Sequence, residues 1–135
     1  MRADCHMHTY FSGDSEAKPE DMVLAAIDKG LEAICFTDHE DIDYFCDDIE
    51  FVFDPETYFK ELGALKEKYK EKLDIRIGVE FGLQPHLAKK AKAFTAANPY
   101  DFVIGSMHVV GGKDPYYPEF FEGISDEEAD RKSTR

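Results

Sequence analysis

Four short apolar runs alternate with longer amphipathic stretches along this 135-residue chain. Runs of this kind are typical of buried parallel strands, and they cover 4–8, 31–37, 75–81 and 101–107. Apolar residues at helical spacing, together with helix-start signals, predict helices over 19–29, over 55–73, over 85–97 and from 126 onward. The βα order therefore occurs four times, which implies parallel strands joined by right-handed crossovers.

Local signals predict where several of these helices begin or end. Pro19 and the pair Asp54-Pro55 suit the first turn of a helix, and Gly30 is typical of a helix end. Ser125 and Glu128 have the spacing of a capping box at the start of the last helix. With four βα units, we expect an α/β fold with a parallel sheet that corresponds to about half of a βα barrel.

Polar residues with metal-binding chemistry follow each predicted strand. His6 and His8 stand two positions apart on the first strand, so both imidazoles can face one point. Asp14 follows in the next loop, and each later strand ends in a further candidate. These later candidates are His39, Glu80 and His108. Because the carboxyl ends of the strands form the active-site face of a βα barrel, we expect a metal site there.

The donor atoms determine which metals suit such a site. Four imidazoles and two carboxylates, without thiolates, favour Mn²⁺, Fe²⁺ or Zn²⁺ over copper(I) or an iron–sulfur cluster. The carboxylate of Glu80 can bridge two metal ions. Paired ions can generate a hydroxide at neutral pH and hold the oxygens of a phosphoryl group, so hydrolysis of a phosphate ester follows from this chemistry.

Other polar residues have simpler interpretations. Ser106 lacks the Gly-x-Ser-x-Gly surroundings of a nucleophilic serine. Asp38 should point away from the direction of His39, so we interpret it as a structural or supporting acid. His86 is expected to be solvated or to cap a helix, and the acids of 40–50 are expected to lie in a solvated loop. Four phenylalanines are assigned to the core: Phe11, Phe36, Phe81 and Phe102.

Composition narrows the possible partners and location. The formal net charge of −13 disfavours a nucleic-acid backbone, but it permits a small phosphorylated substrate, because bound divalent cations reverse the local charge. Cys5, Cys35 and Cys46 have no zinc-type spacing, and we interpret them as reduced thiols, with Cys5 and Cys35 buried in strands. With no signal peptide and no apolar run of membrane-spanning length, we expect a cytoplasmic protein without membrane contact.

The motifs around these residues resemble one group of enzymes. The motifs are His6-Met7-His8-Thr9, Phe11-Ser12 with Asp14, Thr37-Asp38-His39, Gly78-Val79-Glu80 and Gly105-Ser106-Met107-His108. Together they resemble the polymerase and histidinol phosphatase (PHP) superfamily. Segments 78–83 and 102–123 are similar to its histidinol-phosphatase branch in particular. The resemblance covers nearly the whole chain and fades after about residue 128.

This resemblance implies a fold, a metal set and a reaction. The fold is a distorted (β/α)7 barrel with up to three divalent metal ions. The six candidates would share these ions, with His6, His8 and Glu80 on the first, Glu80 and His108 on the second, and Asp14 and His39 on the third. The implied reaction is hydrolysis of L-histidinol phosphate to L-histidinol and phosphate in histidine biosynthesis, with a metal-bound hydroxide as nucleophile. Glu80 and His108 are the implied catalytic residues.

The end of the chain departs from the family pattern. The pattern requires a further His beyond His108 and a later Asp-x-His, and both are missing, so the chain resembles an N-terminal fragment. We expect a partial PHP domain over 1–130 and a polar tail over 131–135. Missing barrel strands would leave open sheet edges, which favour self-association.

Two alternatives to a histidinol phosphatase follow from these observations. One is another PHP phosphoesterase, such as a nucleotide phosphatase or a nuclease, although the low content of basic residues counts against a polymer substrate. The other is a metal-binding module without catalysis, which the missing ligands favour. For the same reason we expect the chain alone to be weakly active or inactive.

Overall fold

Five parallel strands form a sheet in the computed structural model, which describes residues 2–44 and 51–133. The strands are β1 (Ala3–Met7), β2 (Ala33–Phe36), β3 (His39–Glu40), β4 (Asp74–Gly82) and β5 (Phe102–Ser106). β1 pairs with β2, and β2 pairs with the first half of β4. The short β3 pairs with the second half of β4, and β5 pairs with the opposite edge of β4. Three strands, namely β1, β5 and the short β3, therefore each pair with one strand only.

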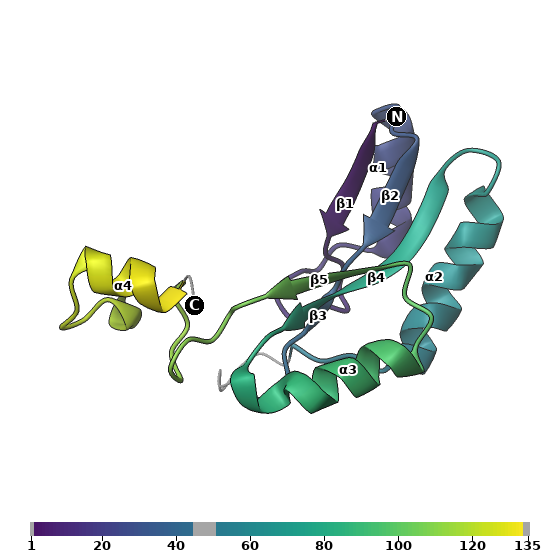
Figure 1. The fold of residues 1–135 in the computed structure, drawn as a ribbon. Coiled ribbons are helices and arrows are strands. Elements are labelled where there is room, and N and C mark those ends of the chain that lie inside the picture. The colour runs from purple at the N-terminus through teal and green to yellow at the C-terminus, as the bar shows by residue number, and fades with distance from the viewer. Residues whose placement is uncertain (1, 45–50, 134–135) are drawn as a thin grey trace.

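Three helices connect the strands and pack on one face of the sheet, namely α1 (Pro19–Asp28), α2 (Pro55–Tyr69) and α3 (Ala88–Ala97) (Figure 1). A fourth helix, α4 (Asp126–Ser133), follows β5, and two short 3-10 helices are η1 (Pro85–Leu87) and η2 (Pro118–Phe120). Figure 1 shows α4 apart from the sheet, after an extended segment that follows β5. None of the described helices is both long and apolar enough to cross a membrane. The expected α/β fold with a parallel sheet is confirmed.

The core lies between the sheet and the helices. Alternate apolar side chains of the two inner strands face the helices: Ile34, Phe36, Ile75 and Ile77. They pack against buried side chains of α1 and α2: Val23, Ala26, Tyr58, Leu62, Leu65 and Tyr69. α3 joins this packing through Phe94, whose ring lies 5.6 Å from that of Phe81. The helices thus bury one face of the sheet and leave the strand ends free to carry polar residues.

Three of the predicted helix starts are confirmed. α1 begins at Pro19, without a side-chain capping contact. Asp54 caps α2 by accepting a hydrogen bond from the backbone N–H of Thr57 at 2.9 Å. Ser125 caps α4 in the same way by accepting a hydrogen bond from the backbone N–H of Glu128 at 3.2 Å. The local sequence therefore determines where these three helices begin.

A buried acid holds the loop between β1 and α1. Asp38 is fully buried, and its Oδ1 accepts hydrogen bonds from the backbone and hydroxyl of Thr9 and from the hydroxyl of Ser12. The Ser12 hydroxyl also accepts a hydrogen bond from the backbone N–H of His39 at 2.9 Å. Asp38 thus has the structural role that the sequence predicts, and it anchors the loop that carries Asp14.

Two core assignments are wrong, and both concern outer strands. Cys5 of β1 is exposed, whereas Cys35 of β2 is buried as expected. Phe102 of β5 is 46% exposed rather than part of the core. Both residues lie on strands that have a neighbouring strand on one side only. The periodicity of a strand does not reveal whether it is an inner or an outer strand.

Two segments also differ from the expected loops and tail. Glu40 and Asp41 are buried, so the start of the stretch 40–50 is not a solvated loop, because β3 extends to Glu40. The rest of that stretch, 45–50 with Cys46, lies outside the described residues. At the other end, α4 continues to Ser133, so part of the expected polar tail is helical.

The tight packing at Gly78 generates a stability prediction. A Cβ there would lie 2.6 Å from the carbonyl oxygen of Phe102 and 3.0 Å from Sγ of Cys35. Gly78→Ala should therefore lower the free energy of unfolding of the metal-free chain by about 1–3 kcal/mol, because the β4 and β5 backbones must move apart. Urea denaturation followed by circular dichroism measures this change.

Gly63 in α2 provides the matched control. A Cβ at Gly63 has no atom within 4 Å. Gly63→Ala should raise the free energy of unfolding by about 0.5–1 kcal/mol, because alanine lowers the entropic cost of forming a helix. Equal effects of the two substitutions would contradict the close approach at Gly78.

Candidate metal centre

Six polar side chains converge where the strands end. Glu80 of β4 lies directly beside His39 of β3 in the parallel register. The other four come from β1 and the segment after it, and from the residues after β5: His6, His8, Asp14 and His108. The structure therefore brings together all six residues that the sequence singles out.

Glu80 is at the centre of this cluster, and its side chain is 5% exposed. Its Oε2 lies 2.8 Å from Nε2 of His6 and 3.1 Å from Nε2 of His8. Its Oε1 lies 3.1 Å from Nε2 of His108. The two carboxylate oxygens thus face different imidazoles, which is the arrangement expected of a carboxylate that bridges two metal ions.

A second group of donors forms around Asp14. Its Oδ2 lies 3.5 Å from Nε2 of His39, and its Oδ1 lies 3.9 Å from Nδ1 of His8. His8 therefore faces Glu80 with one ring nitrogen and Asp14 with the other. Candidate ligand atoms form three groups, and within each group all the atoms lie within 4.8 Å of one another. The groups are His6–His8–Glu80, His8–Asp14–His39 and His39–Glu80–His108.

Asp41 also belongs to the cluster, and the sequence interpretation missed it. Its Oδ2 lies 2.8 Å from Nδ1 of His108 and 3.2 Å from Nδ1 of His39. The available signal was its spacing, because a residue two positions after His39 faces the same side of an extended chain. The adjoining acids suggested a solvated loop instead, and burial of Asp41 shows that this interpretation was wrong.

The contacts shift the pKa values of acids and imidazoles in opposite directions. Burial raises the pKa of Glu80, but hydrogen bonds with His108, His8 and His6 outweigh burial and hold that pKa well below its usual range. Hydrogen bonds to Asp41 and then to Glu80 raise the pKa of His108 to about 10. The hydrogen bond with Glu80 also raises the pKa of His8. In the metal-free chain at neutral pH, Glu80 is therefore ionised and His108 is protonated.

The donor set fits divalent metal ions. In the part of the chain that the structure describes, Glu80, Asp14 and Asp41 form ion pairs with histidines and not with Lys or Arg. Nδ1 of His39 is buried and makes no well-aligned hydrogen bond. Imidazole and carboxylate groups are the ligands that Zn²⁺, Mn²⁺ and Fe²⁺ accept. Metal ions could therefore supply the positive charge that these carboxylates lack.

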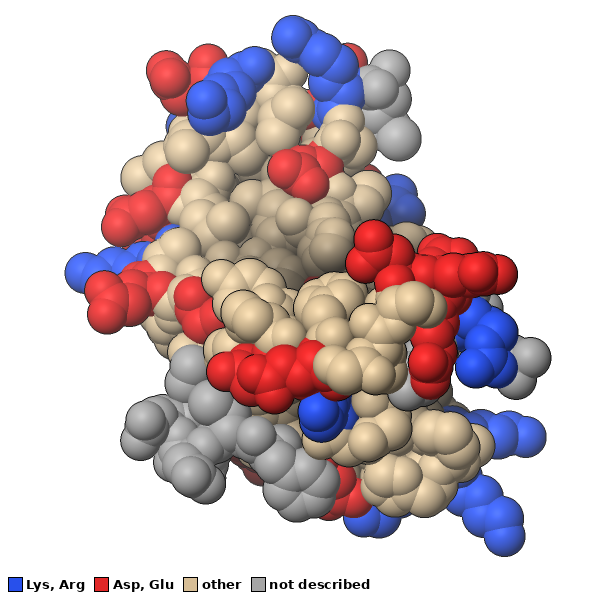
Figure 2. Space-filling model, turned by 90° about the vertical axis from the view of Figure 1, so that its left-hand side faces the viewer, with Lys and Arg blue, Asp and Glu red and all other residues tan. Residues whose placement is uncertain are grey.

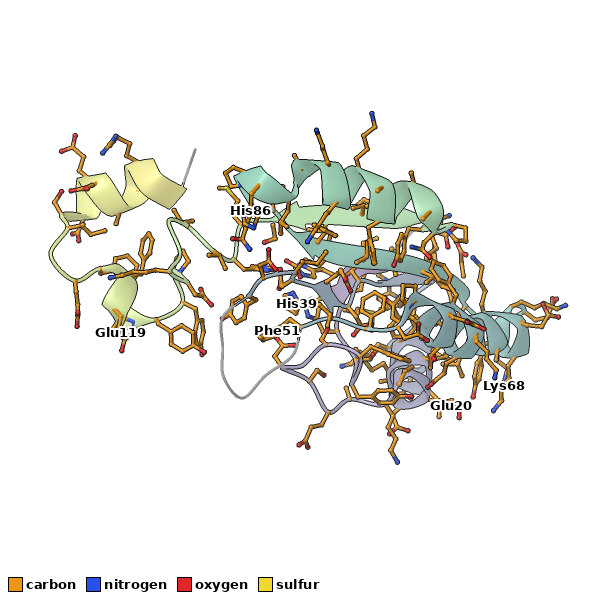
Figure 3. All side chains as sticks on the ribbon, turned by 90° about the horizontal axis from the view of Figure 1, so that it is seen from below. Glu20, His39, Phe51, Lys68, His86 and Glu119 are labelled. Atoms are coloured by element: carbon orange, nitrogen blue, oxygen red, sulfur yellow. The ribbon has the colours of Figure 1, made fainter. Side chains whose placement is uncertain are left out.

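Two other polar candidates lie outside the cluster. His86 of η1 is exposed and pairs with Asp43 at 3.0 Å, which agrees with the solvated role expected for it. Figure 3 shows His86 near α3 and away from His39, whose ring lies 5.3 Å from that of Phe51. Ser106 ends β5 and pairs in the ladder with Gly82 of β4. Neither residue supplies a donor atom to the three sets of candidate ligands.

A cavity of about 550 Å³ adjoins the cluster. Four cluster residues line it, namely Asp14, His39, Asp41 and His108. Its other lining residues are Asp114 and four aromatic residues, namely Tyr44, Phe51, Tyr116 and Tyr117. The Tyr44 hydroxyl donates a hydrogen bond to Asp114, which links the segment after β3 to the segment after β5. The cavity is large enough for a small organic molecule beside the candidate metal ligands.

The fold and the cluster together define a class, the α/β-barrel proteins with a metal site at the carboxyl ends of their strands. Comparison with known proteins identifies the family. The PHP domain model matches residues 4–133. The chain belongs to the PHP domain family.

The chain is also similar to named members and to a solved structure. It is 37% identical over 132 residues to the histidinol-phosphatase of Lactococcus lactis, covering 97% of this chain and 48% of that protein. It is 32% identical over 120 residues to a probable histidinol-phosphatase of Deinococcus radiodurans, covering 87% and 46%. The crystal structure of the Lactococcus lactis enzyme complexed with zinc, L-histidinol and phosphate matches with a TM-score of 0.90 and 39% identity, over 96% of this chain and 49% of that one. The chain thus spans about half the length of these relatives.

The raised pKa of His108 generates a prediction about metal binding. Metal ligation requires a neutral imidazole, so binding of Zn²⁺ should release the proton that His108 carries at neutral pH. Because protons compete with the metal, zinc affinity should rise with pH from neutral towards pH 10, by up to about tenfold per pH unit for each proton released. Calorimetric titration in buffers of different ionisation enthalpy counts the released protons.

Two histidine variants test the source of the proton. His108→Ala should lower the number of released protons by about one, because the imidazole with the raised pKa is lost. His86→Ala should leave the number unchanged, because His86 pairs with Asp43 at the surface. The same proton count in wild type and His108→Ala would contradict the prediction.

Proposed function

We propose that this chain forms the metal-binding half of a phosphomonoesterase that hydrolyses L-histidinol phosphate to L-histidinol and phosphate. The main supporting observation is Glu80, whose two carboxylate oxygens face different histidines at the ends of parallel strands. Membership of the PHP family and similarity to the histidinol-phosphatase of Lactococcus lactis support the choice of substrate.

The six candidate ligands are proposed to divide among up to three metal positions. The first position takes His6, His8 and Glu80, the second takes Glu80 and His108, and the third takes Asp14 and His39. Three groups of close donor atoms support this division: the first group matches the first position, the second position's group also includes His39, and the third position's group also includes His8. We propose zinc as one metal, because the similar Lactococcus lactis enzyme was crystallised with zinc, and Mn²⁺ and Fe²⁺ suit the same donors.

Metal ions at these positions would act as Lewis acids on phosphoryl oxygens and lower the pKa of water to produce a nucleophile. The side chains provide the charge and the orientation that this chemistry needs. Glu80 keeps its negative charge at neutral pH and sets the spacing of the first two positions. His108 lines the cavity and is held between Glu80 and Asp41, so its ring has a fixed orientation beside the space that a substrate would occupy.

The cavity supports a small substrate with an aromatic ring and a positive charge. Its aromatic side chains can stack on an imidazole, and Asp114 can pair with an ammonium group. L-Histidinol phosphate carries both groups, and its phosphate would lie toward the metal ligands. Figure 2 shows acidic side chains around a hollow of other residues on one face, which is a poor surface for a nucleic-acid backbone.

Two alternative functions can be tested by the same experiments. Another PHP phosphoesterase, such as a nucleotide phosphatase or nuclease, would share the metal ligands and differ in its substrate. A metal-binding module without catalysis is consistent with a chain that spans about half of its relatives. We also propose a cytoplasmic location, which the free thiols of Cys5 and Cys35 support, and self-association through the outer strands β1 and β5.

An assay of phosphate release tests the proposal. We predict that the chain loaded with Zn²⁺ or Mn²⁺ releases phosphate from L-histidinol phosphate slowly when alone. Release should be faster after mixing with the C-terminal half of the Lactococcus lactis enzyme, which lies beyond the stretch that this chain matches. Glu80→Ala should lower this release by about 100-fold or more and weaken zinc binding, because two metal positions lose a ligand.

The controls separate the three functions. His86→Ala should retain both zinc binding and phosphate release. Faster hydrolysis of a nucleotide or an oligonucleotide than of L-histidinol phosphate would favour the alternative phosphoesterase. Tight zinc binding without phosphate release, alone and in the mixture, would instead favour the metal-binding module.

A further inference from the structure

We infer that Asp41 is a positioning residue, which orients the rings of His39 and His108 and fixes the tautomer of His108 that metal binding requires. The inference rests on the proposed metal site, in which these two histidines are ligands. Asp41 is outside the ligand sets, and both histidines present their Nδ1 atoms to it. Asp41 therefore contacts the candidate ligands and is not itself one of them.

Five side chains form a continuous path across the cluster, and Asp41 is its middle member. At one end, Oε1 of Glu80 lies 3.1 Å from Nε2 of His108, whose Nδ1 lies 2.8 Å from Oδ2 of Asp41. At the other end, the same Oδ2 lies 3.2 Å from Nδ1 of His39, whose Nε2 lies 3.5 Å from Oδ2 of Asp14. Both histidines thus turn Nδ1 toward Asp41 and Nε2 toward a candidate metal ligand.

The chemistry of a carboxylate determines the tautomer of His108. Its Nδ1 lies in hydrogen-bond geometry 2.9 and 2.8 Å from the two oxygens of Asp41. An ionised carboxylate only accepts hydrogen bonds, so this nitrogen must carry a hydrogen, and the neutral ring keeps the lone pair on Nε2 for a metal ion. Nδ1 of His39 lies 3.2 Å from Oδ2 of Asp41 without hydrogen-bond alignment, so Asp41 orients that ring by charge alone. A carboxylate behind a metal-binding histidine is a general means of orienting that ligand.

The fold holds the Asp41 carboxylate in place. Asp41 is 6% exposed, and its backbone N–H donates a hydrogen bond to the carbonyl of Phe51 at 2.6 Å. The carboxylate lies against β4 at Gly82, where a Cβ would be 1.7 Å from Oδ1 of Asp41. Glycine at position 82 is therefore required for this carboxylate position. The space for Asp41 comes from β4, the same strand that carries Glu80.

One carboxylate shared by two ligands should couple two metal positions. His108 belongs to the second proposed position and His39 to the third. Without the charge of Asp41, the His108 ring can adopt the tautomer with hydrogen on Nε2, which cannot bind a metal through that atom, and the His39 ring loses the charge that orients it. Loss of such a supporting carboxylate typically lowers metal affinity by about 10–100-fold.

Asp41→Asn is the direct test, because asparagine keeps the shape of the side chain but removes its charge. Zinc affinity of the full chain, measured by competition with a chromophoric chelator, should fall by about 10–100-fold. Long-range ¹H–¹⁵N spectra of the zinc-loaded chain should show hydrogen on Nδ1 of His108 in wild type and its loss in the variant. The visible absorption of bound Co²⁺ should keep its band positions, because the ligands themselves are unchanged.

Two further variants serve as control and as independent test. Asp43→Asn is the control, because Asp43 lies two positions from Asp41 and pairs with the exposed His86. The backbone φ of 59° at Asp43 is one that asparagine tolerates. This variant should leave zinc affinity and histidine tautomers unchanged. Gly82→Ala should displace the Asp41 carboxylate and lower zinc affinity as Asp41→Asn does. Circular dichroism establishes that each variant is folded before titration.

The outcomes separate this inference from the metal site on which it rests. Wild-type zinc affinity and unchanged tautomers in Asp41→Asn would overturn the positioning role, even if that variant were less stable. Shifted Co²⁺ bands, or loss of one bound zinc, would overturn it by making Asp41 itself a ligand. If wild type binds no zinc, the proposed metal site fails, and the inference fails with it.

Discussion

The site depends on one buried carboxylate, Glu80, and on what surrounds it. An ionised carboxylate that is 5% exposed is costly to bury unless charged or hydrogen-bonding partners replace water. Here the partners are imidazoles on both oxygens, and they come from the ends of β1 and β5 as well as from β3. β4 carries the carboxylate between these strands. A change in the register of β4 against β3 or β5 would separate Glu80 from its histidine partners. The sheet and the site therefore form together.

The parallel sheet also explains how six donors that are far apart in sequence meet within four βα units. Each strand delivers its polar end to the same side, so assembling the ligands requires the order of the strands but not a closed barrel. Covering the sheet requires more. β1 and β5 keep an unpaired edge, and Phe102 and Val103 of β5 are 46% and 42% exposed. The six candidate ligands therefore meet within these strands, whereas the edges of β1 and β5 stay uncovered in this half-barrel.

Much of this arrangement could be predicted from sequence, because it depends on local periodicity. Short apolar runs and helix caps predicted the elements, and polar residues after each run predicted the cluster. The rest depends on tertiary position. Nothing local distinguishes the outer strands β1 and β5 from inner ones, so Cys5 and Phe102 were wrongly assigned to the interior. Asp41 was missed because its burial depends on two features that the local sequence does not reveal. One is the two-residue strand β3, and the other is the space beside Gly82, which lies on a strand about 40 residues later in the chain.

The proton on His108 and a bound metal ion are alternative ways of balancing the same charges. Glu80 and Asp41 flank His108 on opposite ring nitrogens, and together they raise its pKa to about 10, so a proton stays on the ring at neutral pH. That proton lets the cluster form without metal, because the buried acids keep a positive partner. If His108 bound a metal ion through Nε2, its contact with Glu80 would be replaced, and the hydrogen on Nδ1 would still face Asp41. Asp41 would then keep the ring of His108 in the orientation that it has in the metal-free cluster.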